Sequence, residues 1–563
     1  MRRHLPLLLA LLLTPLLVAW PLPRVWSTAL LTVLGREAAA HVWGLWAALQ
    51  EGSPLNIRTD LLGYPEGVSL VLIDAGNLPF FALGSWAGPA AGYNTVLWGG
   101  LLVAGVAGAL LARRLGGAAW LGAVLAMAAP PMLAASAEGA TEDFGVGWVL
   151  LQLALLLRFL DEGRTRDGVL AALALAMAWY CGPYNGIWAA TMDLTIALWV
   201  IARGWSAQPT APLRRGPALG RAALVGGAAL LLCLPLARAM LGLRDPNLPG
   251  SLGRTSLPPV VESPLAFRGG LRNSADLLDP WLPLQLTGGE AAVSHTAYLG
   301  LVVLVVAVVA LVKDRRRWPW LAGALAFALL SLGPWLHLRG RLLTVGDEAV
   351  LGPAGLLIAA CPPLGGLAHW YRAGAVAALL LVPLVASLGR GWRGPVLATL
   401  VLLDSLLGAP RAWPLHQAVP PSSAALRQLE PGALIEFPRE EEPARTPWDW
   451  RYRNVLAQVD HGHPVAGGLM GLPLGHEAQL AYLMVHRAAS GHPLSTQRLE
   501  GLLEQGFRWV VLHPELLEHG EQAASALRRC FGAPVVVEPG LRVFDLGQRG
   551  PGCAQPAVPA QSP

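Results

Sequence analysis

Long runs of apolar residues, separated by short polar junctions, fill residues 1–409 of the chain. Most runs are close to the twenty or so residues that a helix needs to cross a bilayer, and some are a little shorter. We therefore expect about eleven membrane-spanning helices. The runs lie at 1–22, 93–112, 118–135, 144–160, 168–183, 184–202, 218–241, 297–312, 318–337, 373–389 and 395–409.

Arginine and lysine gather at every second junction between these runs. Cytoplasmic loops of membrane proteins carry an excess of basic residues, so this alternation predicts a cytoplasmic N-terminus and an uncleaved first span. The remaining junctions then face outward. The basic positions are Arg2 and Arg3, Arg113 and Arg114, Arg158 to Arg166, Arg203 to Arg221, Lys313 to Arg317, and Arg390 and Arg393. The outward segments are 23–92, 136–143, 182–184, 243–296 and 338–372.

The pattern changes after about residue 410. Four short β-type runs, at 432–438, 506–514, 533–539 and 541–546, accompany a helical stretch at 522–531. We expect residues 410–547 to form a small α/β domain on the outer side of the membrane, because an odd number of spans precedes it. Residues 548–563 are rich in Pro, Gly and Gln, and this composition predicts a disordered tail.

The composition supports this mainly α, polytopic membrane fold. Of the 563 residues, 54% are hydrophobic and only 14% are charged, whereas soluble domains carry about a quarter charged residues. We expect membrane lipids as partners and no nucleic acid, because the arginines are dispersed among apolar runs. No P-loop, GxSxG, CxxC or HExxH motif occurs, which argues against ATP-driven transport, serine hydrolysis and zinc proteolysis. Cys530 and Cys553 are free to pair or to remain reduced.

The first outward segment contains the densest group of polar and aromatic residues. Val42, Leu45, Trp46 and Leu49 recur at helical spacing. This spacing predicts an amphipathic helix that lies on the membrane surface, with its Trp rings at the level of the lipid headgroups.

Acidic residues from two outward segments are the first candidates for catalysis. Glu37 opens the predicted surface helix, and Glu138, Glu142 and Asp143 lie in the second outward segment, 136–143. Two such groups at one face of a helical bundle could supply a general base and a charge stabiliser, or hold a divalent metal through Glu37 and Asp143. The structural alternative is that acids near the ends of spans are simply solvated.

Further polar residues are candidates for substrate binding. His41, Asp60 and Tyr64 lie in the first outward segment, where Tyr64 to Gly67 also has the composition of a tight turn. His369 and Arg372 precede a later span. A guanidinium matches phosphate oxygens with paired donors, so Arg372 could bind a phosphate, although an interfacial anchor is an equal alternative.

These motifs together resemble the GT-C superfamily of polytopic glycosyltransferases, and in particular a large bacterial branch of it. The likeness covers most of the chain, through short motifs. They comprise Gly35, His41, Trp43 and Trp46, then Thr59–Asp60, Tyr64–Pro65, Gly67 and Ser69–Leu70, then Tyr93–Asn94, LLARRLGG at 110–117 and the acids at 138–143, and in the tail LIEFP at 434–438, HGHPVAGG at 461–468 and FRWVVLHP at 507–514.

The resemblance implies a bacterial inner-membrane enzyme that takes a sugar from a polyprenyl-phosphate donor and passes it to a periplasmic acceptor. It also implies an acid in the first outward segment as base or metal ligand. Here Arg36 follows Gly35, and the nearest acid is Glu37. A shift of one residue turns a helical side chain by about 100°. A non-catalytic scaffold for envelope polysaccharide, or a lipid or polysaccharide transporter, are the alternative functions.

Overall fold

A computed structural model describes the chain at 4–32, 35–72, 74–203, 215–242, 274–283, 297–339, 341–367, 369–408, 415, 417–418, 424–438, 450–467 and 475–550. The chain divides into two compact units. The first unit consists of Met1–Leu34, Ile73–Arg238 and Thr255–Ala418, and the second of Gly35–Leu72, Ala239–Arg254 and Val419–Pro563. Most of the predicted outward segment 243–296 and of the tail 548–563, including Cys553, lies outside the described residues.

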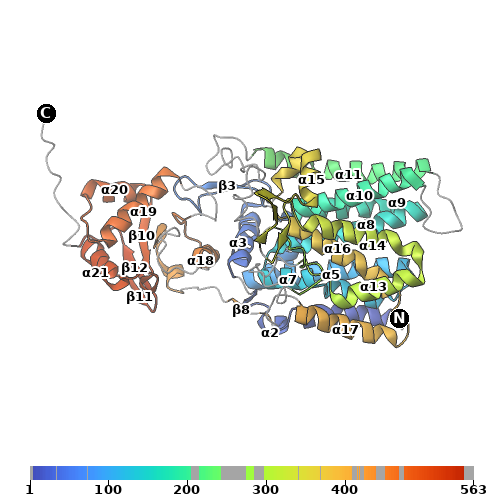
Figure 1. Ribbon diagram of the computed structural model, residues 1–563. Helices are drawn as coiled ribbons and strands as arrows, with labels where there is room; N and C mark the ends of the chain where they lie inside the picture. The colour runs from blue at the N-terminus through green and yellow to red at the C-terminus, as the bar shows by residue number, and fades with distance from the viewer. Residues whose placement is uncertain are drawn as a thin grey trace. The chain divides into compact units, whose positions relative to one another are not determined.

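The first unit is built from helices, many of which lie side by side (Figure 1). A helix occurs at each of the eleven predicted runs. The main helices are α1 (Leu5–Val18), α5 (Pro89–Arg114), α6 (Ala119–Met127), α7 (Pro130–Glu138), α8 (Val146–Glu162), α9 (Thr165–Tyr180), α10 (Pro183–Arg203), α11 (Arg215–Gly242), α13 (Leu301–Lys313), α14 (Trp318–Ser331), α16 (Ala373–Ala386) and α17 (Arg393–Gly408).

Shorter elements connect these helices. They are α2 (Leu22–Val25), α4 (Leu78–Ser85) and α15 (Pro353–Ala360), the 3-10 turns η1 (Ala75–Asn77), η2 (Thr141–Gly145), η6 (Arg315–Arg317), η7 (Pro362–Gly366) and η8 (Trp370–Arg372), and the strand pairs β1 (Leu30–Leu31) with β8 (Gln417–Ala418), β4 (His337–Leu338) with β5 (Arg341–Leu342), and β6 (Thr344–Val345) with β7 (Glu348–Ala349). The turns η2 and η8 begin the long helices α8 and α16.

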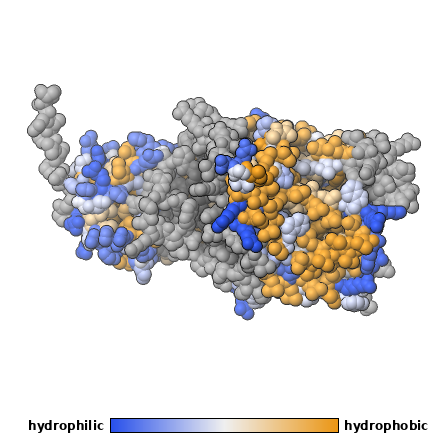
Figure 2. Space-filling model, viewed as in Figure 1, coloured by the Kyte–Doolittle hydropathy of each residue, from blue (hydrophilic) through white to orange (hydrophobic). Residues whose placement is uncertain are grey.

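Three described helices are long and apolar enough to cross a membrane. They are Pro89–Arg114, Thr141–Glu162 and Pro217–Gly242, and the pair α6 and α7, bent by 44°, makes a fourth if it counts as one span. Large apolar side chains are also exposed, among them Leu231 on α11 at 69% and Val312 on α13 at 75%. Figure 2 shows a broad hydrophobic surface over this unit. These features indicate a membrane location, while the number of eleven spans remains a prediction.

Close contacts between helices rely on glycine. A Cβ atom on Gly108 of α5 would lie 2.3 Å from the carbonyl oxygen of Gly122 on α6, and one on Gly122 would lie 2.4 Å from that of Gly108. No side chain other than hydrogen fits either position. Small residues of this kind let helices approach closely within a membrane, where packing rather than water exclusion holds helices together.

The basic junctions of the first unit meet one another. Arg114 at the end of α5 pairs with Asp161 at the end of α8. Arg390, before α17, donates to the carbonyl oxygen of Gly116, and Arg317 of η6 donates to Ser387 after α16. These contacts join the C-terminal ends of α5, α8 and α16 and the turn between α13 and α14. The basic junctions at Arg114, Arg317 and Arg390 therefore lie together at one end of the helical unit, which we call its basic end.

The second unit contains a four-stranded sheet in the order β11-β12-β10-β9, made from the four predicted strands. The strands are β9 (Ala433–Phe437), β10 (Phe507–Leu512), β11 (Val536–Glu538) and β12 (Leu541–Asp545), with β9 and β10 parallel and the other pairs antiparallel. The remaining elements are α18 (Trp450–His461), α19 (His476–Ala489), α20 (Thr496–Glu504), α21 (Gly520–Phe531), η9 (Leu426–Gln428) and η10 (Pro514–Leu516). The helix predicted at 522–531 is α21.

Residues 35–72 fold with the C-terminal part of the chain. They form α3 (Gly35–Glu51) and the hairpin of β2 (Ile57–Thr59) and β3 (Val68–Leu70). The fully buried Gln458 of α18 joins the two parts: its Oε1 accepts from Trp43 Nε1 at 2.6 Å, and its Nε2 donates to the carbonyl oxygens of Leu61 and His463. We expected the Trp rings of this helix at the lipid headgroups. For Trp43 that expectation is wrong, because its ring is buried against α18.

Tyr64 makes a similar connection. Its hydroxyl donates to the carbonyl oxygen of Gln505 at 2.6 Å, and its ring packs edge-on against Phe507 with 5.2 Å between centroids. Cys530 of α21 is disulfide-bonded, whereas Cys181, Cys233 and Cys361 are free.

Replacing Gln458 tests how far the second unit depends on this junction. In Gln458→Leu, Trp43 Nε1 and two carbonyl oxygens lose their partner without regaining water, which we expect to destabilise the unit by about 3 kcal/mol or more. Hydrogen exchange of α3 and α18 in the full chain measures the loss. Gln50→Leu makes the same change at an exposed site of α3, and we expect an effect within about 0.5 kcal/mol. Equal effects of the two variants would contradict the role of Gln458.

The second unit should lose stability in mild acid. Burial, assisted by His463, lowers the pKa of His461 from 6.5 to about 3, and burial lowers that of His513 to about 3. The unfolded chain binds these protons near pH 6.5 and the folded chain does not, so stability is greatest above about pH 6.5 and declines as the pH falls toward 3. At pH 5 each histidine lowers the free energy of unfolding by on the order of 2 kcal/mol relative to its value at neutral pH and above.

His513→Asn isolates one of these titrations. The ring Nδ1 of His513 lies 3.3 Å from the carbonyl oxygen of Gly540, and an Asn amide can donate the same bond without titrating. Hydrogen exchange of β10 and β12 at pH 7.5 and pH 5 should show a smaller pH dependence in this variant, and an unchanged one in His519→Asn at an exposed position. A full pH dependence in His513→Asn would refute the assignment.

Candidate active site

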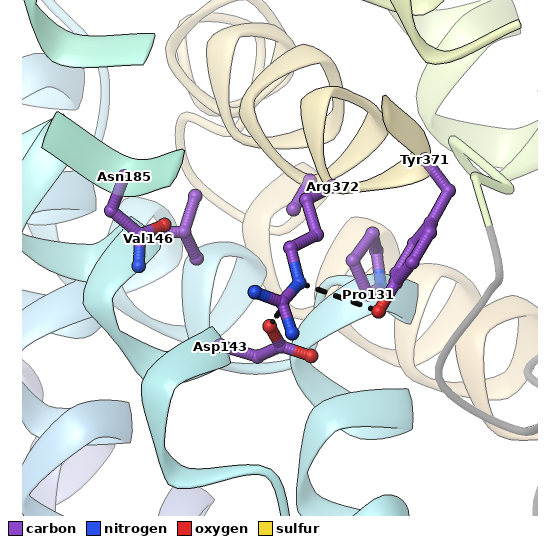
Figure 3. Close-up of a pocket in the computed structure, with 7 residues that line it drawn as sticks. Pro131, Asp143, Val146, Asn185, Tyr371 and Arg372 are labelled. Atoms are coloured by element: carbon purple, nitrogen blue, oxygen red, sulfur yellow. Dashed lines mark hydrogen bonds and ion pairs between the residues drawn. The ribbon is translucent and has the colours of Figure 1, made fainter. Parts of the chain in front are cut away.

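Arg372 binds two neighbouring acidic side chains. Its Nη2 pairs with Glu142 Oε1, and its Nε lies 2.9 Å from Asp143 Oδ1. Glu142 and Asp143 belong to η2, which leads into α8, whereas Arg372 ends η8 and leads into α16. Figure 3 shows Arg372 and Asp143 pointing toward one another. The site therefore lies at the N-terminal ends of α8 and α16, opposite the basic end described above.

The three side chains are largely removed from solvent. Arg372, Glu142 and Asp143 expose 12%, 12% and 11% of their side-chain surface. The two carboxylates share one guanidinium. Burying an unpaired charge costs several kcal/mol, so each carboxylate depends on Arg372 for compensation.

Aromatic rings surround the guanidinium. Arg372 Cζ lies 4.9 Å from the ring centroid of Tyr184 and 5.9 Å from that of Tyr371, and its Nε donates to Tyr371 Oη at 3.3 Å. Such cation–π contacts add to the electrostatic stabilisation of the arginine. His369 packs against both tyrosines. Burial and the nearby Arg372 charge lower the pKa of His369 to about 4, so this ring is neutral at neutral pH.

A small cavity adjoins the ion pairs. Its lining is Pro131, Asp143, Val146, Asn185, Tyr371, Arg372 and Ala375. The volume is about 20 Å³, which accommodates a water molecule rather than a sugar ring. Asp143 lines this cavity and Glu142 does not. A hydroxyl or water entering from this side therefore meets Asp143 first.

Polar residues outside the predicted set of site residues lie beneath the acidic turn. Thr141 donates through its hydroxyl to Asp74 Oδ2, Asn77 Nδ2 donates to the carbonyl oxygen of Thr141 at 2.9 Å, and Asn185 Nδ2 donates to that of Glu142 at 2.8 Å. Both asparagines are buried. In the sequence these residues are marked by being polar within otherwise apolar segments. Asp74 and Asn77 occur in DAGN, and Asn185 occurs in PYNG.

The structure brings together four of the predicted site residues: Glu142, Asp143, His369 and Arg372. The backbones of Glu37 and Glu138 lie in α3 and α7, but their side chains lie outside the described residues. His41, Asp60 and Tyr64 belong to the second unit. Asp60 is exposed and Tyr64 is engaged as described above, so a substrate-binding role for His41, Asp60 and Tyr64 remains a prediction.

A metal site of protein ligands alone does not occur in the described part of the chain, where no three His, Cys, Asp or Glu side chains are grouped suitably. Glu142 and Asp143 could provide two carboxylate ligands, and Mg²⁺ is commonly held by one or two carboxylates with water and substrate phosphate. The predicted ligand pair of Glu37 and Asp143 is not tested, because the Glu37 side chain lies outside the described residues.

Two solved transferase structures align with most of this chain. Arabinofuranosyltransferase AftD from Mycobacteria matches 97% of this chain and 40% of its own length, with 17% identity and a TM-score of 0.47. The Archaeoglobus fulgidus oligosaccharyltransferase matches 91% of this chain and 70% of its own length, with 11% identity and a TM-score of 0.45. The chain thus spans about two fifths of the arabinofuranosyltransferase. No protein-family model and no curated protein sequence matches it.

Replacing Arg372 should destabilise the first unit. Arg372→Met removes the guanidinium that pairs with two buried carboxylates, and we expect a loss of about 3–5 kcal/mol, read as a lower melting temperature of the purified full chain. Adding Glu142→Gln and Asp143→Asn removes the two charges that the guanidinium compensated and should restore part of that loss. Arg341→Met, at an exposed site of β5, is the matched control. Equal melting temperatures for the two single variants would show that the ion pairs contribute nothing.

Proposed function

We propose that this chain is a membrane glycosyltransferase of the GT-C type. It transfers a sugar from a lipid-phosphate donor, such as a polyprenyl-phosphate sugar, to a hydroxyl acceptor. The reaction takes place at the end of the helical unit that carries Glu142, Asp143 and Arg372. By the positive-inside rule this end faces the periplasm of a bacterial inner membrane, because the basic junctions lie at the other end.

The observation that carries the proposal is the pair of adjacent, nearly buried carboxylates held by one arginine beside a cavity. Burying ionised groups is costly, and such clusters beside a cavity are common at functional sites. The short motifs shared with the GT-C superfamily support the same reading. The disulfide at Cys530 agrees with an oxidising compartment for the second unit.

In the proposed reaction Asp143 is the general base, because its carboxylate lines the cavity. It accepts the proton of the acceptor hydroxyl as the acceptor oxygen forms a bond to the anomeric carbon of the sugar. The bond from that carbon to the phosphate oxygen breaks, and its electron pair leaves with the lipid phosphate. No oxidant or reductant is needed. General-base assistance of this kind contributes about 10²–10⁴-fold to rate.

Arg372 has two tasks in this proposal. Its ion pairs orient Glu142 and Asp143 and favour their charged forms. A guanidinium has five N–H donors, so Arg372 can also stabilise the negative charge that develops on the leaving phosphate. Since the cavity is water-sized, donor binding must open the site. Glu37 remains the second candidate for the base or for a metal ligand. Glu138 remains a candidate for an acid that assists the base.

The test is transfer by full-length protein in membrane vesicles, with ¹⁴C-labelled mannose, glucose or arabinofuranose on polyprenyl phosphate as donors. We expect Asp143→Asn to reduce transfer at least about 10²-fold. Glu162→Gln, at the far end of α8 with 40% of its side chain exposed, should leave transfer unchanged. Glu37→Gln distinguishes the two candidate bases. The base is the residue whose replacement by the corresponding amide abolishes transfer.

The other results have definite meanings. Full activity in both Asp143→Asn and Glu37→Gln would overturn the assignment of both bases. No transfer by folded, inserted wild-type protein from any of these donors would favour the alternative of a non-catalytic scaffold, which Arg36 at the position after Gly35 already suggests.

A further inference from the structure

The acidic turn η2 is anchored from two other elements through its backbone. Asn77 of η1 donates to the carbonyl oxygen of Thr141, and Asn185 of α10 donates to that of Glu142. These two carbonyls belong to the consecutive peptide units on either side of the Glu142 Cα atom. The peptide group between Glu142 and Asp143 is also held through its N–H, since the Asp143 N–H donates to the Ala140 carbonyl oxygen at 3.1 Å.

Fixing two consecutive peptide planes fixes the direction in which the side chains leave the backbone. With the planes before and after Glu142 held, its φ and ψ angles have little freedom, and the Cα position of Asp143 follows. The backbone therefore holds both carboxylates in the orientation in which they pair with Arg372. Thr141 adds a third anchor through its hydroxyl bond to Asp74, a residue that is fully buried.

The surrounding atoms are arranged to admit these amides. A Cβ atom on Gly145 would lie 2.3 Å from Asn185 Nδ2 and 2.8 Å from Cys181 Cβ, so only glycine leaves room for Asn185 under the turn. A Cβ on Gly76 would lie 2.5 Å from Cys181 Sγ. That thiol lies 3.6 Å from Asn77 Oδ1 and so supports the orientation in which Asn77 donates to the turn.

We propose that Asn77 and Asn185 are positioning residues for the acid pair, acting through the backbone of η2 rather than on substrate. This inference rests on the proposed function for its consequence in catalysis, while the anchoring itself is independent of it. A position held in this way keeps the reacting carboxylate within the narrow range of geometry that a general base requires.

The first experiment needs no substrate. Hydrogen exchange of the full-length protein in nanodiscs is measured in the peptide that covers η2, for wild type, Asn185→Ala and Asn77→Ala. We expect exchange there to rise by about tenfold in each variant, because a buried carbonyl loses its partner.

Asn94→Ala is the matched control. Asn94 is a buried asparagine of α5 in the same unit, and its Nδ2 likewise donates to backbone carbonyls, those of Trp26 and Ala29 at 2.9 Å each. It should loosen its own segment and leave η2 unchanged. Unchanged exchange of η2 in both Asn77→Ala and Asn185→Ala would overturn the inference whatever the protein's activity proves to be.

The second experiment separates positioning from mere stability. Among the described residues, the groups near the turn that titrate or carry charge are Arg372, His369, Tyr184, Tyr371, Asp74 and Cys181, together with Glu142 and Asp143 themselves. The second measurement is the transfer rate as a function of pH. A loosened turn moves the carboxylates away from the guanidinium, which favours their ionised form. In Asn185→Ala the decline of the rate at low pH, the acid limb of the profile, should therefore move up by about one pH unit. A variant that is only less stable has a smaller folded fraction, which lowers the rate by the same factor at every pH and leaves the acid limb where it is.

The donor for this profile is the polyprenyl-phosphate sugar that gives transfer with the wild type. A shifted limb in Asn185→Ala together with an unshifted limb in Asn94→Ala supports the inference. An unshifted limb in Asn185→Ala, despite faster exchange of η2, would show that the acid pair does not depend on this anchoring. Absence of transfer by the wild type would count against the proposed function alone, since the exchange result stands separately.

Discussion

The ion pairs of Arg372 with Glu142 and Asp143 are the constraint around which the first unit is arranged. Each of the three side chains exposes only about one tenth of its surface. Two carboxylates in so little water would be expensive without a cation, and the guanidinium is the group that can bind both. Because the acids lie before α8 and the arginine before α16, the same contacts fix where two of the long helices begin.

Charge is divided between the two ends of this unit. At the basic end, arginines pair with Asp161, carbonyl groups and a serine that belong to neighbouring helix ends. At the other end, Arg372 pairs with both Glu142 and Asp143. The helices between carry apolar and small residues, with glycines where backbones approach most closely. Such a division suits an embedded protein, because charges placed at helix ends avoid the high cost of charges within hydrocarbon.

The second unit is held together by a different device. One buried amide, that of Gln458, satisfies an indole N–H and two carbonyl groups from segments that are distant in the sequence. Tyr64 then packs on the strand that begins at Phe507. A polar hub of this kind is stabilising only while all its members are paired. It explains why residues 35–72 fold with residues after 419 rather than as a separate surface helix.

The sequence by itself determined the local structure. Apolar runs located a helix at each predicted position, β-type runs located the strands of the second unit, and the chemistry of Glu142, Asp143 and Arg372 marked them as candidates. Periodicity is a local signal, however, and it cannot show which distant residues meet. Arg372 and Glu142 are 230 positions apart, and Trp43 and Gln458 are 415 apart. Only the tertiary structure decided those pairs and the support from Asn77 and Asn185, because directional hydrogen bonds and ion pairs form only where packing brings donor and acceptor together.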